Sequence, residues 1–370
     1  MHSPLTPDFY VSEDIFARER DRIFRRLWIF AGLKQLLKEP DAFLTRAIGG
    51  MPIVIQNFDG RLHAFENQCR HRQMPLQFEE YGRRRLACRY HGWVYGADGL
   101  PCSIPERNEL YRLSDAQCSN LGLKEFALAA IGNFLFINLS ERPIGIEEQF
   151  RPQFLAKLSD ISTQFDDELI HTRIGTHYNW KFNVENVMDF NHIRYLHPRT
   201  FLPLMGESKD ITAQIPVPAL DEADLSNAKL NGLSYASETP FTIKPRPWHE
   251  KVRRYGTADV YYSFFVYPNV NFISVGGLVF LIQQFDPVSP SRTEVVFTLM
   301  TARKTTHIPA HPAVLWGQLQ GQKMVLDEDV RLLERLQAGL HDGSQRAFHG
   351  AYERHLIKVA RVYRELLGLP

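Results

Sequence analysis

Apolar side chains near the N-terminus recur at the spacing of one face of a helix. Ser12 is a residue type that caps helices, and the acidic Glu13 and Asp14 after it suit a first turn. The apolar positions that follow are Ile15, Phe16, Ile23, Phe24, Leu27 and Trp28. This pattern predicts a helix over residues 12–30 with one apolar face on a core.

Three short runs rich in β-branched and aromatic residues come next, at 43–48, 52–57 and 61–66. Gly49-Gly50 and Asp59-Gly60 separate the runs, and both dipeptides favour two-residue hairpin turns. We therefore predict a meander of antiparallel strands in this part of the chain.

The remaining pattern predicts a second, larger domain. An apolar strand at 135–139 closes a small β domain that we place at residues 41–142. Residues 1–40 and 143–370 then form a domain with both helices and strands. Within it the following aromatic residues fit strands of an antiparallel sheet: Tyr261, Tyr262, Phe264, Phe265, Tyr267 and Phe272. The expected fold class is α+β, with a small all-β domain beside a larger mixed one.

A C-x-H pair and a C-x2-H pair stand out from the strand pattern. Cys69 and His71 form the first pair, and Cys88 and His91 form the second. Two thiolates and two imidazoles are the ligands of a [2Fe–2S] centre in which histidines hold one iron. A structural zinc site uses the same residue types. Zinc sites commonly pair Cys with Cys and His with His, whereas each pair here has one of each.

The two pairs, with Gly92-Trp93 and the later Gly99, resemble the cluster motif of Rieske proteins. The resemblance implies that the cysteines bind one iron and the histidines bind the other. Respiratory Rieske proteins have an extra Cys in each ligand loop, and this chain has Met74 and Tyr90 instead. In this respect the chain resembles the oxygenase type. The family usually has Gly two residues after the first His, and this chain has Gln73 there.

Six arginines surround the pairs, namely Arg70, Arg72, Arg83, Arg84, Arg85 and Arg89. A solvated turn explains such a run of charge. A positive rim that steers an acidic electron donor towards the histidines explains it equally well. The sequence leaves both interpretations open.

A second candidate metal site begins after Asn179. Asp189, His192 and His197 form D-x2-H-x4-H, and Pro198 follows. Residues three apart share a helix face, but residues five apart diverge by roughly 140°. Both histidines can therefore reach one ion only if the helix ends between them, and Pro198 disfavours a helical conformation at His197. Two imidazoles and one carboxylate form the facial triad of non-haem Fe(II) oxygenases.

The third ligand has three candidates, Asp327, Glu328 and Asp329. Asp329 lies on an apolar stripe of its predicted helix, formed by Val325, Leu326, Leu332, Leu333 and Leu336. A carboxylate on such a stripe is costly unless it is paired or bound to metal. We therefore select Asp329 and keep Glu328 in reserve.

These segments resemble the oxygenase α subunits of Rieske non-haem iron oxygenases, or aromatic-ring-hydroxylating oxygenases. The resemblance extends over nearly the whole chain, including Tyr267-Pro268-Asn269 and the segment ending at Leu340. It implies a helix-grip-like catalytic domain with an antiparallel sheet and long helices. It implies a mononuclear Fe(II) on His192, His197 and Asp329. Asp189 would bridge an iron-ligand histidine to a cluster histidine of the neighbouring subunit, although an ordinary helix-face carboxylate remains the alternative.

The resemblance also implies a mechanism and partners. A reductase or ferredoxin would supply electrons to the [2Fe–2S] cluster, and O₂ would be activated at the Fe(II) to hydroxylate a small molecule. NADH or NADPH would act on a separate reductase, because no G-x-G-x-x-G follows a strand here. The expected assembly is a homotrimer, in which each cluster meets the iron of a neighbour.

Composition narrows the setting. The chain has 370 residues, 44% of them hydrophobic, and a formal net charge of +1, so nucleic acid is not an expected partner. No apolar run reaches the roughly 20 residues of a membrane span, and no signal peptide pattern opens the chain. We expect a cytoplasmic protein, with Cys102 and Cys118 as free thiols.

The sequence does not name the substrate. Residues 199–255 are rich in Pro and are expected to contribute pocket and lid loops. An aromatic acid would need an apolar slot with a polar group at its mouth, and a quaternary amine such as a betaine would need an aromatic cage. An aromatic substrate is the first choice and a quaternary amine the alternative. A Rieske electron-transfer protein without oxygenase activity and a zinc hydrolase are the more distant hypotheses.

Overall fold

The computed structural model describes residues 1–205, 229–340 and 345–369. The chain divides into two compact units, each described here by itself. The large unit contains Met1–Glu19 and Glu147–Pro370, and the small unit contains Arg20–Ile146.

The small unit is built on a seven-stranded sheet with the order β1-β9-β8-β4-β3-β2-β5. Its strands are β1 (Ile29–Leu33), β2 (Ala42–Ile48), β3 (Met51–Phe58), β4 (Arg61–Glu66), β5 (Tyr81–Arg83), β8 (Glu125–Ile131) and β9 (Phe134–Asn138). A separate hairpin pairs β6 (Val94–Tyr95) with β7 (Pro101–Ser103). The short helical elements are Arg20–Phe24, Lys34–Leu37, Arg107–Tyr111 and α3 (Asp115–Ser119).

The hairpins that the sequence predicts are confirmed. β2 pairs with β3 and β3 pairs with β4, all antiparallel. Gly49 and Gly50 have φ values of 54° and 73°, and Asp59 and Gly60 have 51° and 93°. Positive φ at both central residues is the requirement of a type I′ turn, whose twist matches that of the flanking strands.

The predicted N-terminal helix is wrong in extent. The structure has α1 (Asp8–Val11), α2 (Glu13–Glu19) and a π-helical turn at Arg20–Phe24. β1 begins at Ile29, because Phe30 pairs with Phe136 in β9. Ser12 ends α1 as well as preceding α2, and its hydroxyl accepts from the Ile15 N–H at 3.4 Å. Pairing with a distant strand thus overrides the helical periodicity of residues 25–30.

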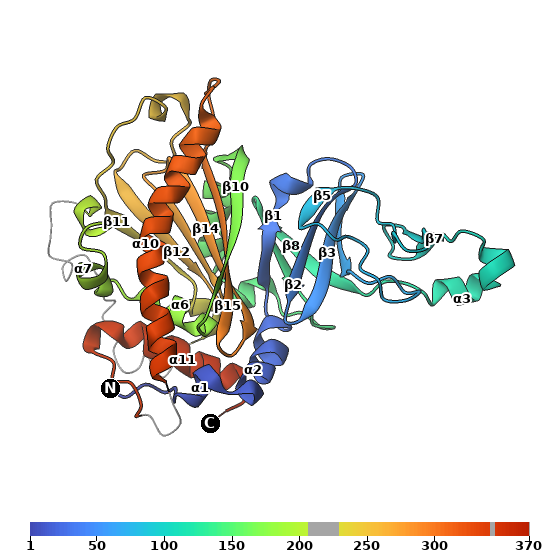
Figure 1. Cartoon of the computed structure of the whole chain (residues 1–370), viewed down its shortest axis with the longest axis horizontal. Helices are drawn as coiled ribbons and strands as arrows, with labels where there is room; N and C mark the ends of the chain where they lie inside the picture. The colour runs from blue at the N-terminus through green and yellow to red at the C-terminus, as the bar shows by residue number, and fades with distance from the viewer. Residues whose placement is uncertain (206–228, 341–344, 370) are drawn as a thin grey trace. The chain divides into compact units, whose positions relative to one another are not determined.

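The large unit contains a six-stranded antiparallel sheet with the order β10-β15-β14-β13-β12-β11 (Figure 1). Its strands are β10 (Phe165–Thr176), β11 (Tyr235–Pro240), β12 (Val260–Val266), β13 (Val270–Val275), β14 (Val279–Ser289) and β15 (Arg292–Ala302). Its helices, besides α1 and α2, are α4 (Ile146–Gln149, which begins in the small unit), α5 (Pro152–Ser162), α6 (Trp180–Met188), α7 (His192–Leu196), α10 (His311–Gly339) and α11 (Arg354–Leu366). Short 3-10 helices lie at Leu202–Leu204, Leu230–Gly232, His249–Lys251 and Ala351–Glu353.

The long helix α10 lies across the sheet, as Figure 1 shows, and contacts β10 and β15. Its buried residues are His311, Leu315, Leu319, Leu326 and Leu333, which repeat every four or seven positions and so share one face. Tyr261, Tyr262, Phe264 and Phe265 lie in β12 and Phe272 lies in β13, as the sequence predicts, and all of them except Tyr261 are buried. Among the described residues, no helix is long and apolar enough to cross a membrane.

A buried ion pair joins three helices of the large unit. Lys181 Nζ in α6 lies 2.5 Å from Glu19 Oε1 in α2, and both side chains are almost fully buried. The Trp180 indole N–H and the Tyr363 hydroxyl of α11 also donate to the Glu19 carboxylate. Two buried charges are tolerated here because each is paired and the remaining oxygen lone pairs are satisfied.

A second carboxylate, which is half-buried, lies one turn further along α6. Glu185 accepts a hydrogen bond from the Tyr10 hydroxyl, and the Tyr10 ring stacks on Phe182 with centroids 4.7 Å apart. Burial raises the pKa of Glu185 to about 7, although Tyr10 and the charge of Lys181 act in the opposite direction. The N-terminal segment is thus held to α6 by a group that titrates near neutral pH.

The pH dependence of stability tests this arrangement. The folded pKa of Glu185 lies above its ordinary value of 4.5, so its contribution to stability is complete below pH 4.5 and is lost as pH rises through about 7. Glu185→Gln should remove this loss. The variant should gain of the order of 3 kcal/mol relative to the wild type between pH 4.5 and 8, measured by urea unfolding.

The exposed Glu13→Gln variant serves as the control and should track the wild type. A Glu185→Gln variant that follows the wild-type pH profile would show that this carboxyl group does not change its protonation on unfolding.

Candidate metal centres

The two Cys–His pairs lie in loops of the small unit with the same backbone geometry. The Cys69 N–H donates to the Met74 carbonyl at 2.8 Å, and the Cys88 N–H donates to the Trp93 carbonyl at 2.8 Å. Each cysteine carbonyl in turn accepts from the residue four positions later, Gln73 or Gly92, at 2.9 and 3.0 Å. The repeated pattern places the two cysteines at equivalent positions of their loops, with His71 two residues after its Cys and His91 three residues after its Cys.

Gln73 adopts the conformation that a glycine would favour. Its φ is 58°, and the equivalent Gly92 has a φ of 71°. A side chain other than glycine costs roughly 1–2 kcal/mol in this left-handed region. The departure from the family motif at Gln73 therefore leaves the loop shape unchanged and adds local strain.

The four side chains divide by burial. Cys69 and Cys88 are 2% and 3% exposed, inside a cluster of apolar side chains. His71 and His91 are half-buried at the edge, with Nδ1 atoms 3.1 Å apart. The His71 ring stacks on Trp93 with centroids 5.3 Å apart. Two sulfurs inside and two imidazoles outside match the division of ligands in a Rieske cluster.

The protonation of the side chains also suits metal binding. Burial lowers the pKa of His71, and the charges of His91 and Arg72 lower it further, so the ring is neutral with a free lone pair. The Tyr95 oxygen accepts from the Arg70 N–H at 2.9 Å, which leaves its hydroxyl hydrogen to donate to Cys69 Sγ at 3.3 Å. Burial raises the pKa of the Cys69 thiol, and this hydrogen bond opposes that shift and favours the thiolate that iron requires. These residues therefore fit a [2Fe–2S] group.

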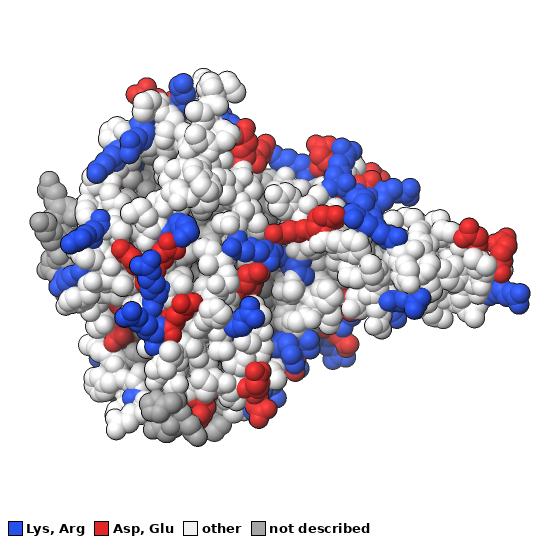
Figure 2. Space-filling model, viewed as in Figure 1, with Lys and Arg blue, Asp and Glu red and all other residues white. Residues whose placement is uncertain are grey.

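The arginines around these loops have two different roles. Arg84 donates to the carbonyls of Ala87 and Leu76 and to the Gln77 side chain, so it is a structural group and not part of an exposed rim. Arg70 and Arg85 are exposed. Figure 2 shows Lys and Arg side chains gathered over the part of the small unit that contains β5. The remaining exposed arginines keep the hypothesis of a positive rim open.

The second candidate centre lies where α6 gives way to α7. Asp189 ends α6 with an extended backbone, at φ −98° and ψ 101°, and α7 starts at His192. The expectation that Asp189 and His192 share one helix face is therefore wrong. His197 follows α7 with φ −114° and ψ 40°, so the helix ends between the two histidines as the sequence predicts.

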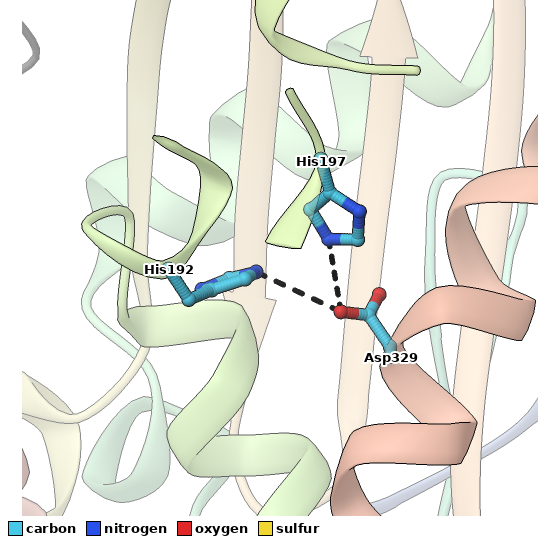
Figure 3. Close-up of side chains that lie close together, drawn as sticks. All are labelled: His192, His197 and Asp329. Carbon is cyan, nitrogen blue, oxygen red and sulfur yellow. Dashed lines mark hydrogen bonds and ion pairs between the residues drawn. The ribbon is translucent and has the colours of Figure 1, made fainter. Parts of the chain in front are cut away.

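His192, His197 and Asp329 converge on one point, as Figure 3 shows. Asp329 Oδ1 lies 3.0 Å from His197 Nε2 and 3.7 Å from His192 Nε2. Two atoms that each bind one ion at about 2.1 Å and at right angles lie about 3 Å apart. The three ligand atoms therefore fit a single metal ion, and other positions around it stay open.

Burial and the nearby carboxylates act in opposite directions on the pKa values of the two histidine rings. Burial lowers the pKa of His192 in spite of the nearby charges of Asp329 and Asp189. Burial also opposes charge on His197, but the hydrogen bonds and charges of Asp329 and Glu328 outweigh it and raise the pKa. A metal ion competes with this proton for His197 Nε2 and Asp329 Oδ1.

Glu328 has a different position from the one that the sequence suggested as a reserve ligand. Its Oε2 lies 2.6 Å from His197 Nδ1, the ring nitrogen that faces away from Asp329, and accepts from the Thr200 hydroxyl at 2.7 Å. A carboxylate behind a ligand histidine fixes its orientation and makes it a stronger ligand. Sequence spacing did not reveal Thr200, and adjacency to Asp329 is the only local signal for Glu328.

Asp189 lies beside this centre and does not join it. Its Oδ2 is 3.9 Å from His192 Nδ1, too far for a hydrogen bond, and its Oδ1 accepts from the Asn191 N–H at 2.8 Å. His192 Nδ1 is buried with no hydrogen-bond partner among the described residues. A small adjustment of the Asp189 side chain would satisfy this atom.

Another group of metal-ligand residue types lies elsewhere in the large unit. Asp166, Glu168 and His311 approach one another, but Lys304 Nζ lies among them, 3.3 Å from Asp166 and 2.7 Å from Glu168. Hydrogen bonds from Lys304 and His311 lower the pKa of Glu168 to about 2. The ammonium group already pairs with both carboxylates of this cluster, which joins β10 to the start of α10.

Two neighbouring cavities lie in this region, and the inner one is bordered by the three converging residues. An inner cavity of about 80 Å³ is bordered by His192, His197 and Asp329 together with polar and apolar side chains. An outer cavity of about 380 Å³ lies beside it. Phe201, Tyr261, Gln322 and Val325 border both. The segments 199–205 and 241–249 contribute to these walls as expected, whereas residues 206–228 of the predicted lid region lie outside the described residues.

Two family descriptions match this chain. The Rieske [2Fe-2S] domain matches residues 27–124, and the catalytic domain of ring hydroxylating alpha subunits matches residues 165–368. The second match spans more than half of the 370 residues. The chain therefore belongs to the family of ring hydroxylating alpha subunits and carries a Rieske domain. The two domains imply a Rieske cluster and a mononuclear iron, as the sequence predicts.

The chain is similar to several curated oxygenase subunits. It is 33% identical over 215 residues to the glycine betaine monooxygenase oxygenase subunit of Pseudomonas aeruginosa, covering 56% of this chain and 48% of that protein. It is 28% identical over 262 residues to the chloroplastic choline monooxygenase of Spinacia oleracea, covering 69% and 58%. The matches thus span about half the length of these curated relatives.

Solved structures share the fold. A quaternary ammonium Rieske monooxygenase, described for carnitine oxidation and inter-subunit electron transfer, has a TM-score of 0.75 at 21% identity, covering 98% of this chain and 94% of that one. Naphthalene 1,2-dioxygenase from Rhodococcus sp. has a TM-score of 0.69 at 16% identity, again covering 98% and 94%. The predicted combination of a Rieske domain with an α+β catalytic domain is confirmed.

The strain at Gln73 generates a stability prediction. Gln73→Gly should raise the thermal midpoint of the small unit, corresponding to about 1 kcal/mol, because glycine adopts positive φ without a steric penalty. Gln68→Gly is the matched control, since Gln68 does not have a positive φ, and it should destabilise the protein. A Gln73→Gly variant that melts below the wild type would contradict the strain argument.

The third ligand generates a second prediction. Asp329→Ala should abolish binding of the mononuclear iron while the visible spectrum of the cluster persists. Asp327→Ala should change neither, because Asp327 is exposed and paired with Lys323. Glu328→Ala should weaken iron binding about 10- to 100-fold without abolishing it. Iron analysis of the purified variants measures these effects, and loss of iron from Asp327→Ala alone would refute the assignment.

Proposed function

We propose that this protein is the terminal oxygenase component of a Rieske oxygenase system, which hydroxylates a small organic molecule with O₂. The observation that carries the proposal is the presence of two separate ligand sets in one chain. Cys69, His71, Cys88 and His91 would hold the [2Fe–2S] cluster. His192, His197 and Asp329 would hold Fe(II). A protein that only transfers electrons has no use for the second set.

The cofactors supply the redox chemistry when bound: the cluster passes single electrons, and the iron activates O₂ for oxygen insertion. The contribution of the chain is to position and orient. Glu328 and Thr200 orient His197, and the inner cavity limits the space beside the three ligands. His192, His197 and Asp329 would hold the iron at the wall of the inner cavity, where a substrate could bind beside it.

Electron delivery involves partners. We infer that a reductase or ferredoxin docks at the histidine edge of the cluster, where exposed arginines favour an acidic protein. The inference of a homotrimer rests on the family resemblance and on a relative of the same fold described for inter-subunit electron transfer. In such a ring Asp189 would bridge His192 to a cluster histidine of the neighbour, and the unpartnered His192 Nδ1 supports this role. The cytoplasmic location stays a prediction.

The domain boundaries of the sequence analysis also stay a proposal. We keep residues 41–142 as the cluster-holding domain and assign residues 1–40 and 143–370 to the catalytic domain. The compact units place residues 20–40 with the small unit, because β1 pairs with β9. The boundary drawn from strand pairing therefore lies at residue 20, whereas the boundary of the proposed cluster-holding domain lies at residue 41.

The relatives favour monooxygenation of a quaternary amine, which the sequence analysis held as its alternative. They are named for glycine betaine, choline and carnitine. Phe201, Phe241 and Tyr261 form a cluster of rings with centroids 5.2–5.5 Å apart beside the cavities, a surface that suits either a cationic methylammonium group or an aromatic ring. The expected aromatic substrate and dioxygenation have less support from the relatives.

Metal content and oxygen uptake test the function together. The reconstituted chain should contain three irons and two acid-labile sulfides and should consume O₂ in a substrate-dependent way when a reductase supplies electrons. His192→Ala should keep two irons and the cluster spectrum but lose hydroxylation. A wild-type chain with only two irons and no oxygen uptake would instead be an electron-transfer protein.

A further inference from the structure

The outer cavity of the large unit has an unusual charge pattern. Among the residues that the structure describes, its wall contains the cationic residues Arg199, Lys244 and Arg246 and no aspartate or glutamate. All three side chains are exposed, and among the residues that the structure describes, no carboxylate forms an ion pair with them. A group of unpaired cations around a hollow produces a positive potential that attracts anions.

The titration of a neighbouring side chain supports this potential. His249 also lines the outer cavity. Burial lowers its pKa first, and the charges of Arg246 and Arg254 lower it further, against the smaller effect of Asp259. The contribution of Arg246 has the sign expected of a positive charge at the cavity wall, whereas Arg254 is paired with Asp259 at 2.6 Å.

The cavity has the dimensions of a ligand site. Its volume of about 380 Å³ lies in the range of about 300–1,000 Å³ that is common for small-molecule sites. Gly317 and Gly321, one turn apart on α10, form part of the wall, and a Cβ atom at either would meet no other atom within 4 Å. A methyl group at either position would occupy part of the cavity. Glycine leaves this space open, although glycine inside a helix costs about 1 kcal/mol of stability relative to alanine.

The outer cavity continues towards the metal centre. Phe201 and Tyr261 border both cavities, and the inner one contains His192, His197 and Asp329. A molecule that reaches from one to the other would place one end beside the three ligands, its middle against the aromatic rings and its other end among the cations. The inner wall carries Asp189 and Asp329, which disfavours an anionic group there in the absence of metal.

From this arrangement we propose that the substrate is an organic carboxylate, whose acid group binds Arg199, Lys244 and Arg246 in the outer cavity while its reacting carbon occupies the inner cavity. The proposal rests on the proposed function and makes the substrate class more specific. The acid can belong to an aromatic carboxylate or to a zwitterionic betaine, because the aromatic rings accept either at the centre. The proposal excludes neutral hydrocarbons and choline as substrates, because they have no acid group.

Binding to the holoenzyme, measured by calorimetry without O₂, tests the proposal with two matched pairs. Benzoate is compared with benzyl alcohol, and glycine betaine with choline. At least one carboxylate should bind about tenfold or more tightly than its partner, and the pair that shows the preference identifies the source of the acid. Higher salt should weaken the carboxylate and not its alcohol partner.

Lys244→Gln with Arg246→Gln should reduce this preference to less than threefold. The double variant Lys251→Gln with Arg253→Gln makes the same change in net charge at exposed positions outside both cavities, and it should retain the preference. Thermal midpoints equal to that of the wild type show that each variant is folded.

Two outcomes of the binding experiment would overturn the proposal. One is that neither carboxylate binds more tightly than its alcohol partner, including the case in which none binds. The other is a preference that survives the Lys244 and Arg246 substitutions. Failure of the oxygenase function is a separate result, because missing iron or absent oxygen uptake leaves the binding preference measurable. Coupled oxygen uptake with a neutral or purely cationic substrate would refute the carboxylate and leave the function intact.

Discussion

The buried pair of Lys181 and Glu19 is the constraint on which the large unit depends. An unpaired ammonium group at this depth would cost several kcal/mol, so α6 is stable in its place only while α2 supplies the carboxylate. Burial lowers the pKa of Lys181, and Glu19 opposes that shift, which shows how closely charge and position are coupled. Because α6 leads directly into the segment with His192 and His197, the same pair indirectly positions these candidate metal ligands.

Both candidate metal centres use irregular backbone where ligands must converge. In the small unit, two loops with matching hydrogen bonds and positive φ at Gln73 and Gly92 present the thiols inward and the imidazoles outward. In the large unit, the extended residue Asp189 interrupts the helical segment, and His197 lies beyond the end of α7. Regular helices cannot bring side chains five positions apart to one ion, so the breaks are the structural requirement for a metal site.

The cavities relate the metal centre to the charge of the chain. A net charge of +1 suggests no preference for an anionic ligand, yet three cations gather on one wall without a carboxylate among the lining residues that the structure describes. Figure 2 shows Lys and Arg side chains along the upper left edge of the large unit, beside the first half of α10. Local distribution of charge, and not its total, determines which ligand a cavity attracts.

The hairpins, the end of the helix before His197 and the candidate ligand residues follow from the sequence alone, because they depend on residue chemistry and local backbone preference. Tertiary structure decided the rest. Leu332 and Leu336 of the predicted apolar stripe are exposed. The stripe therefore led to Asp329 although part of it does not face the core. The contact of His197 with Asp329 joins residues 132 positions apart, and the pairing of Phe30 with Phe136 replaces a predicted helix by a strand. Such contacts depend on how distant segments pack, which local patterns do not encode.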